Sequence, residues 1–121
     1  MLDLSHWPRP TQPWLGVFTD IDDTLTTEGA ITADALQALA ALKRAGLMVI
    51  PTTGRPMGRS RDLAQAWPVD ALVAENGAAA WLPQTSGTPR AIYQQSAAVR
   101  SANWTRMQEV AARIVREVPG A

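Results

Sequence analysis

Val17-Phe18-Thr19-Asp20-Ile21-Asp22-Asp23-Thr24-Leu25-Thr26 is the stretch of sequence that decides the fold. Residues 15–19 form a short apolar run with β-branched and aromatic members, which predicts a buried strand. Asp20, Asp22 and Asp23 follow at once, and three carboxylates this close together repel one another. Such a cluster directly after a buried strand favours a bound cation or charged substrate over a solvated acidic turn. The stretch therefore predicts a functional site where the first strand ends.

Apolar strands and amphipathic helices alternate on the C-terminal side of this stretch. The predicted elements are a strand over 15–19, a helix over 33–45, a strand over 47–51, a helix over 57–67 and a strand over 71–74. This order predicts an α/β Rossmann-like fold, with a parallel sheet, right-handed crossovers and helices on both faces. Ligands of such sheets bind beyond the carboxyl ends of the strands. We therefore expect residues 20–24, 52–55 and 75–77 to face one crevice.

The two ends of the chain differ from this alternating segment. Prolines and tryptophans in residues 1–14 predict an irregular leader. Residues 78–82 and 91–93 predict an antiparallel hairpin. Apolar residues at three- and four-residue steps predict a helix over 103–117. We therefore expect three parts: a leader over 1–14, a partial core over 15–79 and a second unit over 80–121.

Composition excludes several classes of function. Eleven basic and eleven acidic side chains give a formal net charge of zero, so no basic excess favours binding to nucleic acid. The absence of cysteine excludes disulfide scaffolds, thiolate zinc sites and cysteine nucleophiles, and a single histidine excludes a multi-histidine metal site. The apolar runs are too short to span a membrane, and no signal-peptide pattern opens the chain. We expect a cytoplasmic protein that binds neither nucleic acid nor membrane.

The motifs at the three strand ends resemble those of the haloacid dehalogenase superfamily. Asp20, Asp22 and Thr24 match its first motif, an apolar strand that ends in Asp-x-Asp-x-Thr. Thr53 ends a strand as in the second motif. The sequences Thr-Gly-Arg at 53–55 and Glu-Asn-Gly-Ala at 75–78 resemble the sugar-phosphatase (Cof-type) branch, which carries a large α/β cap of the C2 type. The resemblance covers residues 15–80 and implies that residues 80–121 begin such a cap.

The resemblance also implies an activity and a set of site residues. The activity is Mg²⁺-dependent hydrolysis of a small phosphorylated metabolite, such as a sugar phosphate, through an aspartyl-phosphate. Asp20 would be the nucleophile, and Asp22 the general acid and base. The Asp20 carboxylate and the Asp22 backbone carbonyl would hold Mg²⁺. Thr53 would bind the phosphoryl group, together with backbone N–H groups near Asp23 and Gly54.

Three further residues carry two interpretations each. Arg55 faces the same crevice and either contacts the substrate or forms a salt bridge. Asn76 either contacts the substrate or shapes a turn. For Glu75, a solvent-facing or arginine-paired carboxylate is favoured over a functional role.

The later motifs of the superfamily, a lysine and then an acidic pair, have no match in this sequence. The only lysine is Lys43, which precedes the second motif. We therefore expect an incomplete fragment with little or no turnover on its own. Two alternatives remain: a non-catalytic phosphosugar-binding or interaction module, and a receiver-like phosphoacceptor domain. A further expectation is a homo-oligomer that forms through an exposed sheet edge or the C-terminal helix.

Overall fold

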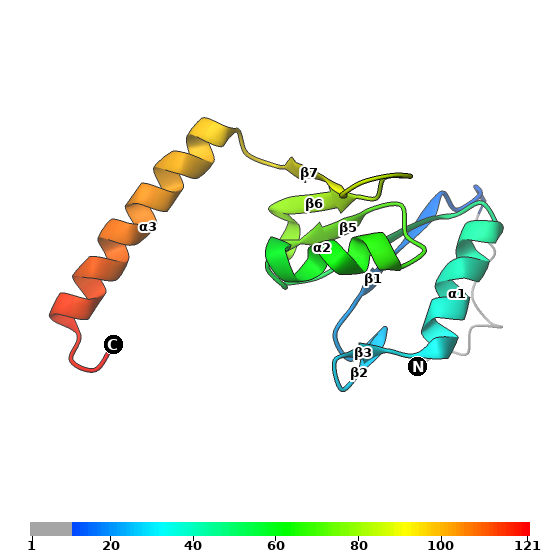
Figure 1. The fold of residues 1–121 in the computed structure, drawn as a ribbon, viewed down its shortest axis with the longest axis horizontal. Coiled ribbons are helices and arrows are strands. Elements are labelled where there is room, and N and C mark those ends of the chain that lie inside the picture. The colour runs from blue at the N-terminus through cyan, green and yellow to red at the C-terminus, as the bar shows by residue number, and fades with distance from the viewer. Residues whose placement is uncertain (1–10) are drawn as a thin grey trace.

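Five strands form one sheet at the centre of the computed structural model, which describes residues 11–121 (Figure 1). They are β1 (Gly16–Asp20), β4 (Met48–Thr52), β5 (Leu72–Ala74), β6 (Ala79–Leu82) and β7 (Arg90–Tyr93). The strands lie in the order β1-β4-β5-β6-β7, with β1, β4 and β5 parallel and β6 and β7 antiparallel to their neighbours. The predicted α/β Rossmann-like fold is confirmed. The predicted leader lies mostly outside the described residues, and residues 11–14 of it form no helix or strand.

Two helices cover the sheet, α1 (Ala33–Arg44) and α2 (Met57–Ala66), each within one residue of its predicted bounds. Leu39 of α1 and Ala64 of α2 belong to one buried core with Val49 and Leu72 of the strands. Right-handed crossovers that step in the same direction across a sheet place their helices on the same face. Within residues 11–121 the covering helices share that face, and Phe18 on the other face is 70% exposed. The predicted helices on the second face are therefore not seen in this part of the chain.

Side-chain caps explain where the helices begin. The Thr32 hydroxyl accepts a hydrogen bond from the Ala35 N–H at 3.4 Å and begins α1 as predicted. The Ser96 hydroxyl accepts one from the Val99 N–H at 3.3 Å, so α3 (Ala97–Glu117) begins six residues before the predicted start at 103. The prediction followed the apolar repeat, which only becomes clear at Trp104, and therefore missed the alanine-rich first turns of α3, residues 97–102.

A small hairpin between β1 and α1 was not predicted. Its strands, β2 (Thr26–Thr27) and β3 (Ala30–Ile31), are two residues long and are joined through Glu28 and Gly29, both with positive φ. Two left-handed residues are the geometry of a type I′ turn, but glutamate is a poor signal for it in a sequence. The hairpin brings Leu25 and Ile31 onto the core beside α1.

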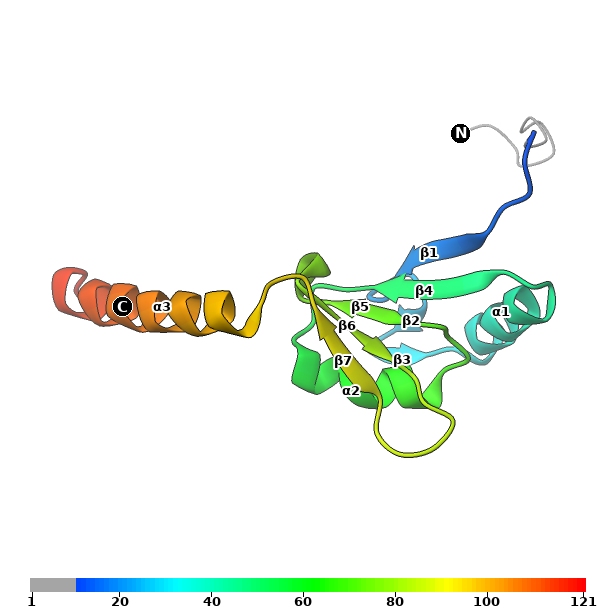
Figure 2. The same ribbon diagram turned by 90° about the horizontal axis from the view of Figure 1, so that it is seen from above.

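The last helix extends away from the sheet. Both ribbon views show α3 projecting from the end of β7 (Figures 1 and 2). None of its residues is buried, and its large apolar side chains, Trp104 among them, are exposed. The predicted hairpin is confirmed as β6 and β7, which continue the sheet, while the division near residue 80 stays a prediction. No helix in residues 11–121 combines the length and the apolar character that crossing a membrane requires.

Asp70 joins three parts of the fold at the amino end of the parallel strands. Its carboxylate accepts hydrogen bonds from Lys43 Nζ at 2.6 Å and from the backbone N–H of Val49 at 2.8 Å. Partial burial acts to raise the pKa of Asp70, but these two partners outweigh it and hold the pKa below its ordinary value. A carboxyl whose pKa is lowered by folding stabilises the fold above its unfolded pKa, and this contribution is lost as the pH falls.

Asp70→Ala is expected to lower the free energy of unfolding at pH 7 by about 1–2 kcal/mol, because it leaves the Val49 N–H without this acceptor. The side chain is partly exposed, so solvent screening keeps the effect at this size. The difference from the wild type should begin to shrink below about pH 4, the ordinary pKa of aspartate in the unfolded chain, and should shrink further as the pH falls towards the lower pKa of folded Asp70. Urea unfolding at pH 7 and pH 3 measures both quantities. Asp62→Ala removes an exposed carboxylate and should change stability by less than about 0.5 kcal/mol; an equal loss in both variants contradicts this role.

Candidate active site

The carboxyl ends of β1, β4 and β5 meet at one edge of the sheet. The strand register places Asp20 beside Thr52, and Thr52 beside Val73. A cavity of about 350 Å³ opens there, lined by Asp20, Thr52, Thr53, Gly54, Val73, Asn76 and Gly77. The structure thus brings the three predicted motifs, which are far apart in sequence, to one crevice.

The acidic loop is anchored by the residue between its first two aspartates. Ile21 is fully buried, and its carbonyl accepts hydrogen bonds from the N–H groups of Leu25 and Thr26, both at 3.0 Å, and from the Thr26 hydroxyl at 3.1 Å. Asp20 and Asp22 flank this anchor and are exposed. Asp23 has a φ of +56°, a left-handed conformation that aspartate tolerates better than most residues. The buried Ile21 therefore anchors the loop and holds the carboxylates of Asp20 and Asp22 at its surface.

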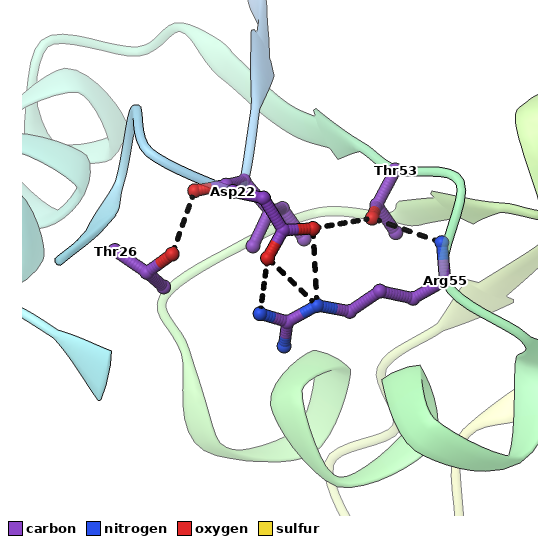
Figure 3. A network of polar contacts seen from close by, with 5 residues as sticks. Asp22, Thr26, Thr53 and Arg55 are labelled. Carbon is purple, nitrogen blue, oxygen red and sulfur yellow. Dashed lines mark hydrogen bonds and ion pairs between the residues drawn. The ribbon is translucent and has the colours of Figure 1, made fainter. Parts of the chain in front are cut away.

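Asp22 forms an ion pair with Arg55 across the crevice (Figure 3). Arg55 Nε donates to the two carboxylate oxygens at 3.1 and 3.2 Å, and Nη2 makes a further close contact with Oδ1. The Thr53 hydroxyl lies 3.4 Å from Oδ2, as a donor, and itself accepts from the Arg55 N–H at 3.1 Å. The hydrogen bond from the Arg55 side chain lowers the pKa of Asp22 below its ordinary value, with smaller contributions from the charge of Arg55 and from Thr53. Asp22 is therefore held in its ionised form.

The loop after β4 and the turn after β5 are hydrogen-bonded to each other. The Asn76 N–H donates to the Thr53 carbonyl at 3.2 Å, and the Glu75 N–H donates to the Arg55 carbonyl at 3.1 Å. A side chain at Gly54 would begin 3.2 Å from the Asn76 Oδ1, so glycine lets the two segments approach closely. Glu75 and Asn76 form part of the short 3₁₀ turn η2 (Glu75–Gly77), and both have positive φ. The left-handed turn and the absent side chain at Gly54 together shape this wall of the cavity.

The oxygen atoms near the cavity suit a hard cation. Within residues 11–121 no cluster of three or more histidine, aspartate or glutamate side chains could hold a metal ion. The acidic loop presents the exposed residues Asp20, Asp22 and Asp23, and the donors expected from the resemblance are the Asp20 carboxylate and the Asp22 backbone carbonyl. Mg²⁺ prefers oxygen ligands and is commonly held through one or two carboxylates, with water and substrate phosphate completing its shell. This small donor set therefore fits Mg²⁺ better than it fits a fully protein-bound metal.

Some of the predicted site residues line the cavity, and the others lie beside it. Asp20, Thr53, Gly54 and Asn76 line the cavity. Asp22 and Arg55 are joined to that group through Thr53, and Asp23 continues the acidic loop. Arg55 does form the salt bridge that sequence reasoning allowed, and its contact with a substrate stays a prediction, as does that of Asn76.

One contact at the site was missed by sequence reasoning. The Glu75 carboxylate accepts a hydrogen bond from the Met57 N–H at 3.1 Å, at the first residue of α2. The signal in the sequence is indirect: α2 follows Pro56, which offers no side-chain cap, so its first N–H groups need an acceptor from water or from another residue. The separation of Met57 and Glu75 in the sequence does not indicate that this acceptor comes from the end of β5.

A family model described as haloacid dehalogenase-like hydrolase matches residues 17–103. No match was found among curated proteins.

Two solved structures show the same fold. One is BT1666 from Bacteroides thetaiotaomicron, described among phosphatases of the haloalkanoate enzyme superfamily, with a TM-score of 0.64 and 20% sequence identity. The match covers 93% of this chain and 40% of that one. The other comes from work on a trigonal-bipyramidal intermediate in a phosphoryl-transfer superfamily. It has a TM-score of 0.51 and 24% identity, and the match covers 69% of this chain and 32% of that one. The chain thus spans less than half the length of either structure.

Proposed function

The chain belongs to the haloacid dehalogenase-like hydrolase family, and from this premise we propose that its site hydrolyses phosphomonoesters through an aspartyl-phosphate. The observation that carries the proposal is that an exposed carboxylate, Asp20, and a hydroxyl, Thr53, line one cavity, while a second carboxylate, Asp22, accepts a hydrogen bond from that hydroxyl. The cavity volume of about 350 Å³ suits a small phosphorylated metabolite such as a sugar phosphate.

Asp20 acts as the nucleophile. In the first step its carboxylate oxygen forms a bond to phosphorus while the bond from phosphorus to the ester oxygen breaks, and Asp22 gives a proton to that oxygen. In the second step water attacks phosphorus, Asp22 accepts the water proton, and the bond to Asp20 breaks to release phosphate. The ionised Asp22 that Arg55 holds is the form required for the second step. The first step needs a proton on the same carboxyl.

The rate of this reaction depends on how well the negative charge of the phosphoryl group and of the Asp20 carboxylate is neutralised. The Thr53 hydroxyl and the backbone N–H groups near Asp23 and Gly54 are donors for the phosphoryl oxygens. Mg²⁺, held by the Asp20 carboxylate and the Asp22 carbonyl, supplies charge neutralisation when bound. The only lysine in the sequence, Lys43, is paired with Asp70 at the other end of the parallel strands. We therefore propose that the chain binds phosphoryl groups but turns substrate over slowly or not at all on its own.

Fluoroberyllate binding tests this function without requiring turnover, because BeF₃⁻ coordinates a carboxylate oxygen and has the shape and charge of a phosphoryl group. We expect bound ¹⁹F resonances to appear when Mg²⁺ is present and to vanish with a chelator. A signal that persists without Mg²⁺ favours a metal-independent phosphate-binding module instead. The absence of any bound signal at millimolar Mg²⁺ and fluoroberyllate contradicts the proposed function.

A further inference from the structure

Glu75 supplies the cap that helix α2 does not provide for itself. The helix begins directly after Pro56, which offers no side-chain acceptor to the first N–H groups. The Glu75 carboxylate, from the turn after β5, accepts from the Met57 N–H at 3.1 Å. A negative charge at this position also interacts favourably with the positive end of the helix dipole. The start of α2 is thus held by a residue on a neighbouring strand end.

The backbone of Glu75 makes a second contact with the same loop. Its N–H donates to the Arg55 carbonyl at 3.1 Å, so Glu75 binds the chain on both sides of Pro56. The next residue, Asn76, donates to the Thr53 carbonyl at 3.2 Å. Residues 53–57 are therefore tied at three points to the turn that contains Glu75.

The fixed loop carries the two side chains that contact Asp22. Arg55 reaches Asp22 through Nε and Nη2, and Thr53 reaches it through its hydroxyl (Figure 3). Glu75 itself has a φ of +52°, a conformation that costs a non-glycine residue free energy and persists where surrounding contacts impose it. The carboxylate contact with Met57 and the backbone contact with Arg55 are the contacts that do so.

We propose that Glu75 is a positioning residue of this site, which acts through residues 53–57 to hold the Arg55 guanidinium and the Thr53 hydroxyl on Asp22. Its consequence for phosphoryl binding rests on the proposed function, whereas its effect on the Arg55–Asp22 pair does not. Glu75 is exposed, as the sequence favoured, but its carboxylate also accepts a hydrogen bond from a backbone N–H, which gives it a role beyond that of a solvated side chain.

Exchange of the Arg55 Nε–H with water, followed by ¹⁵N NMR, reports the ion pair directly. Glu75→Ala removes the acceptor and is expected to speed this exchange about tenfold and to weaken fluoroberyllate binding by a similar factor. Glu75→Gln keeps an oxygen that can accept from Met57 and should stay within about threefold of the wild type for both. Arg55→Lys, which has no Nε–H of this kind, assigns the resonance.

Matched variants separate positioning from general stability. Asp62→Ala removes a carboxylate from α2 whose ion-pair partner among residues 11–121 is its exposed neighbour Arg61, and it should change neither readout. Met57→Pro removes the donor in place of the acceptor at a helix position that proline tolerates, so it should reproduce the Glu75→Ala effect when compared with Met57→Ala. The comparison of Met57→Pro with Met57→Ala therefore tests the proposal even if Glu75→Ala fails to fold.

The proposal is overturned if the Arg55 Nε–H exchanges at the wild-type rate in a folded Glu75→Ala protein. It is also overturned if Glu75→Ala and Glu75→Gln speed this exchange and weaken fluoroberyllate binding equally. Faster Arg55 exchange in Glu75→Ala supports it, even where the wild type binds no fluoroberyllate; that combination counts against the proposed function alone.

Discussion

Asp20→Asn is expected to abolish the Mg²⁺-dependent fluoroberyllate signal and any phosphoryl transfer by the chain. An amide carries no negative charge, so it is a weaker ligand for beryllium and Mg²⁺ than a carboxylate, and it is not a nucleophile that can form an acyl phosphate. Asp20 ends β1 at the cavity, and no other carboxylate lines that cavity within residues 11–121. The rate of any phosphoryl transfer should therefore fall by about a thousandfold or more, which is the scale seen when a catalytic nucleophile is removed.

Stability provides the control for this variant. Asp20 is exposed and belongs to a cluster of mutually repelling carboxylates, so Asp20→Asn should leave the free energy of unfolding unchanged or slightly higher. Asp62→Asn makes the same chemical change on the exposed face of α2 and should leave fluoroberyllate affinity within about twofold of the wild type. Retention of the bound ¹⁹F signal in a folded Asp20→Asn protein excludes Asp20 as the acceptor.

Leu72→Ala is expected to cost about 3 kcal/mol of folding free energy. Leu72 is fully buried in β5 within the core that α1 and α2 share, and truncating a buried leucine removes its transfer free energy and leaves a cavity. This loss is a large share of the 5–15 kcal/mol that typically stabilises a domain. Because β5 leads directly into the turn at Glu75, the variant should also weaken fluoroberyllate binding.

Urea unfolding measures the effect, with Leu15→Ala as the matched control. Leu15 is 78% exposed, so the same truncation there should cost less than about 0.5 kcal/mol. Similar losses at the two positions would show that the core is not packed as the structure has it.

The parallel part of the fold could be predicted because local and long-range signals agree there. Apolar runs end in polar clusters at each of the three parallel strands, and the intervening helix α1 carries its own cap at Thr32. The two-residue strands β2 and β3 could not be predicted, since each is too short to show a period. The early start of α3 is marked by a single capping hydroxyl, Ser96, and the alanine-rich residues 97–102 that follow it show no clear helical repeat of large apolar side chains.

The candidate site shows the same division between local and tertiary information. The residue types at Asp20 and Thr53 indicate that both lie where strands end, and the parallel register then brings them to one cavity, with Asp22 bound to the Thr53 hydroxyl. The sequence allowed Arg55 either to form a salt bridge or to contact the substrate. The position of an arginine in the sequence does not decide which of the nearby acceptors its long side chain binds. The role of Glu75 depends on the distance between its carboxylate and a backbone N–H eighteen residues earlier, which only the fold determines.

Mapping the phosphoryl acceptor tests the proposed chemistry most directly. The chain would be incubated with Mg²⁺ and a small phosphoryl donor such as acetyl phosphate, and any acyl phosphate reduced with borohydride and located by peptide mass spectrometry. We expect one modified position, Asp20, and no modification when Mg²⁺ is chelated. Modification at Asp22, Asp23 or any other residue, with Asp20 unmodified, would contradict the assignment of Asp20 as the nucleophile.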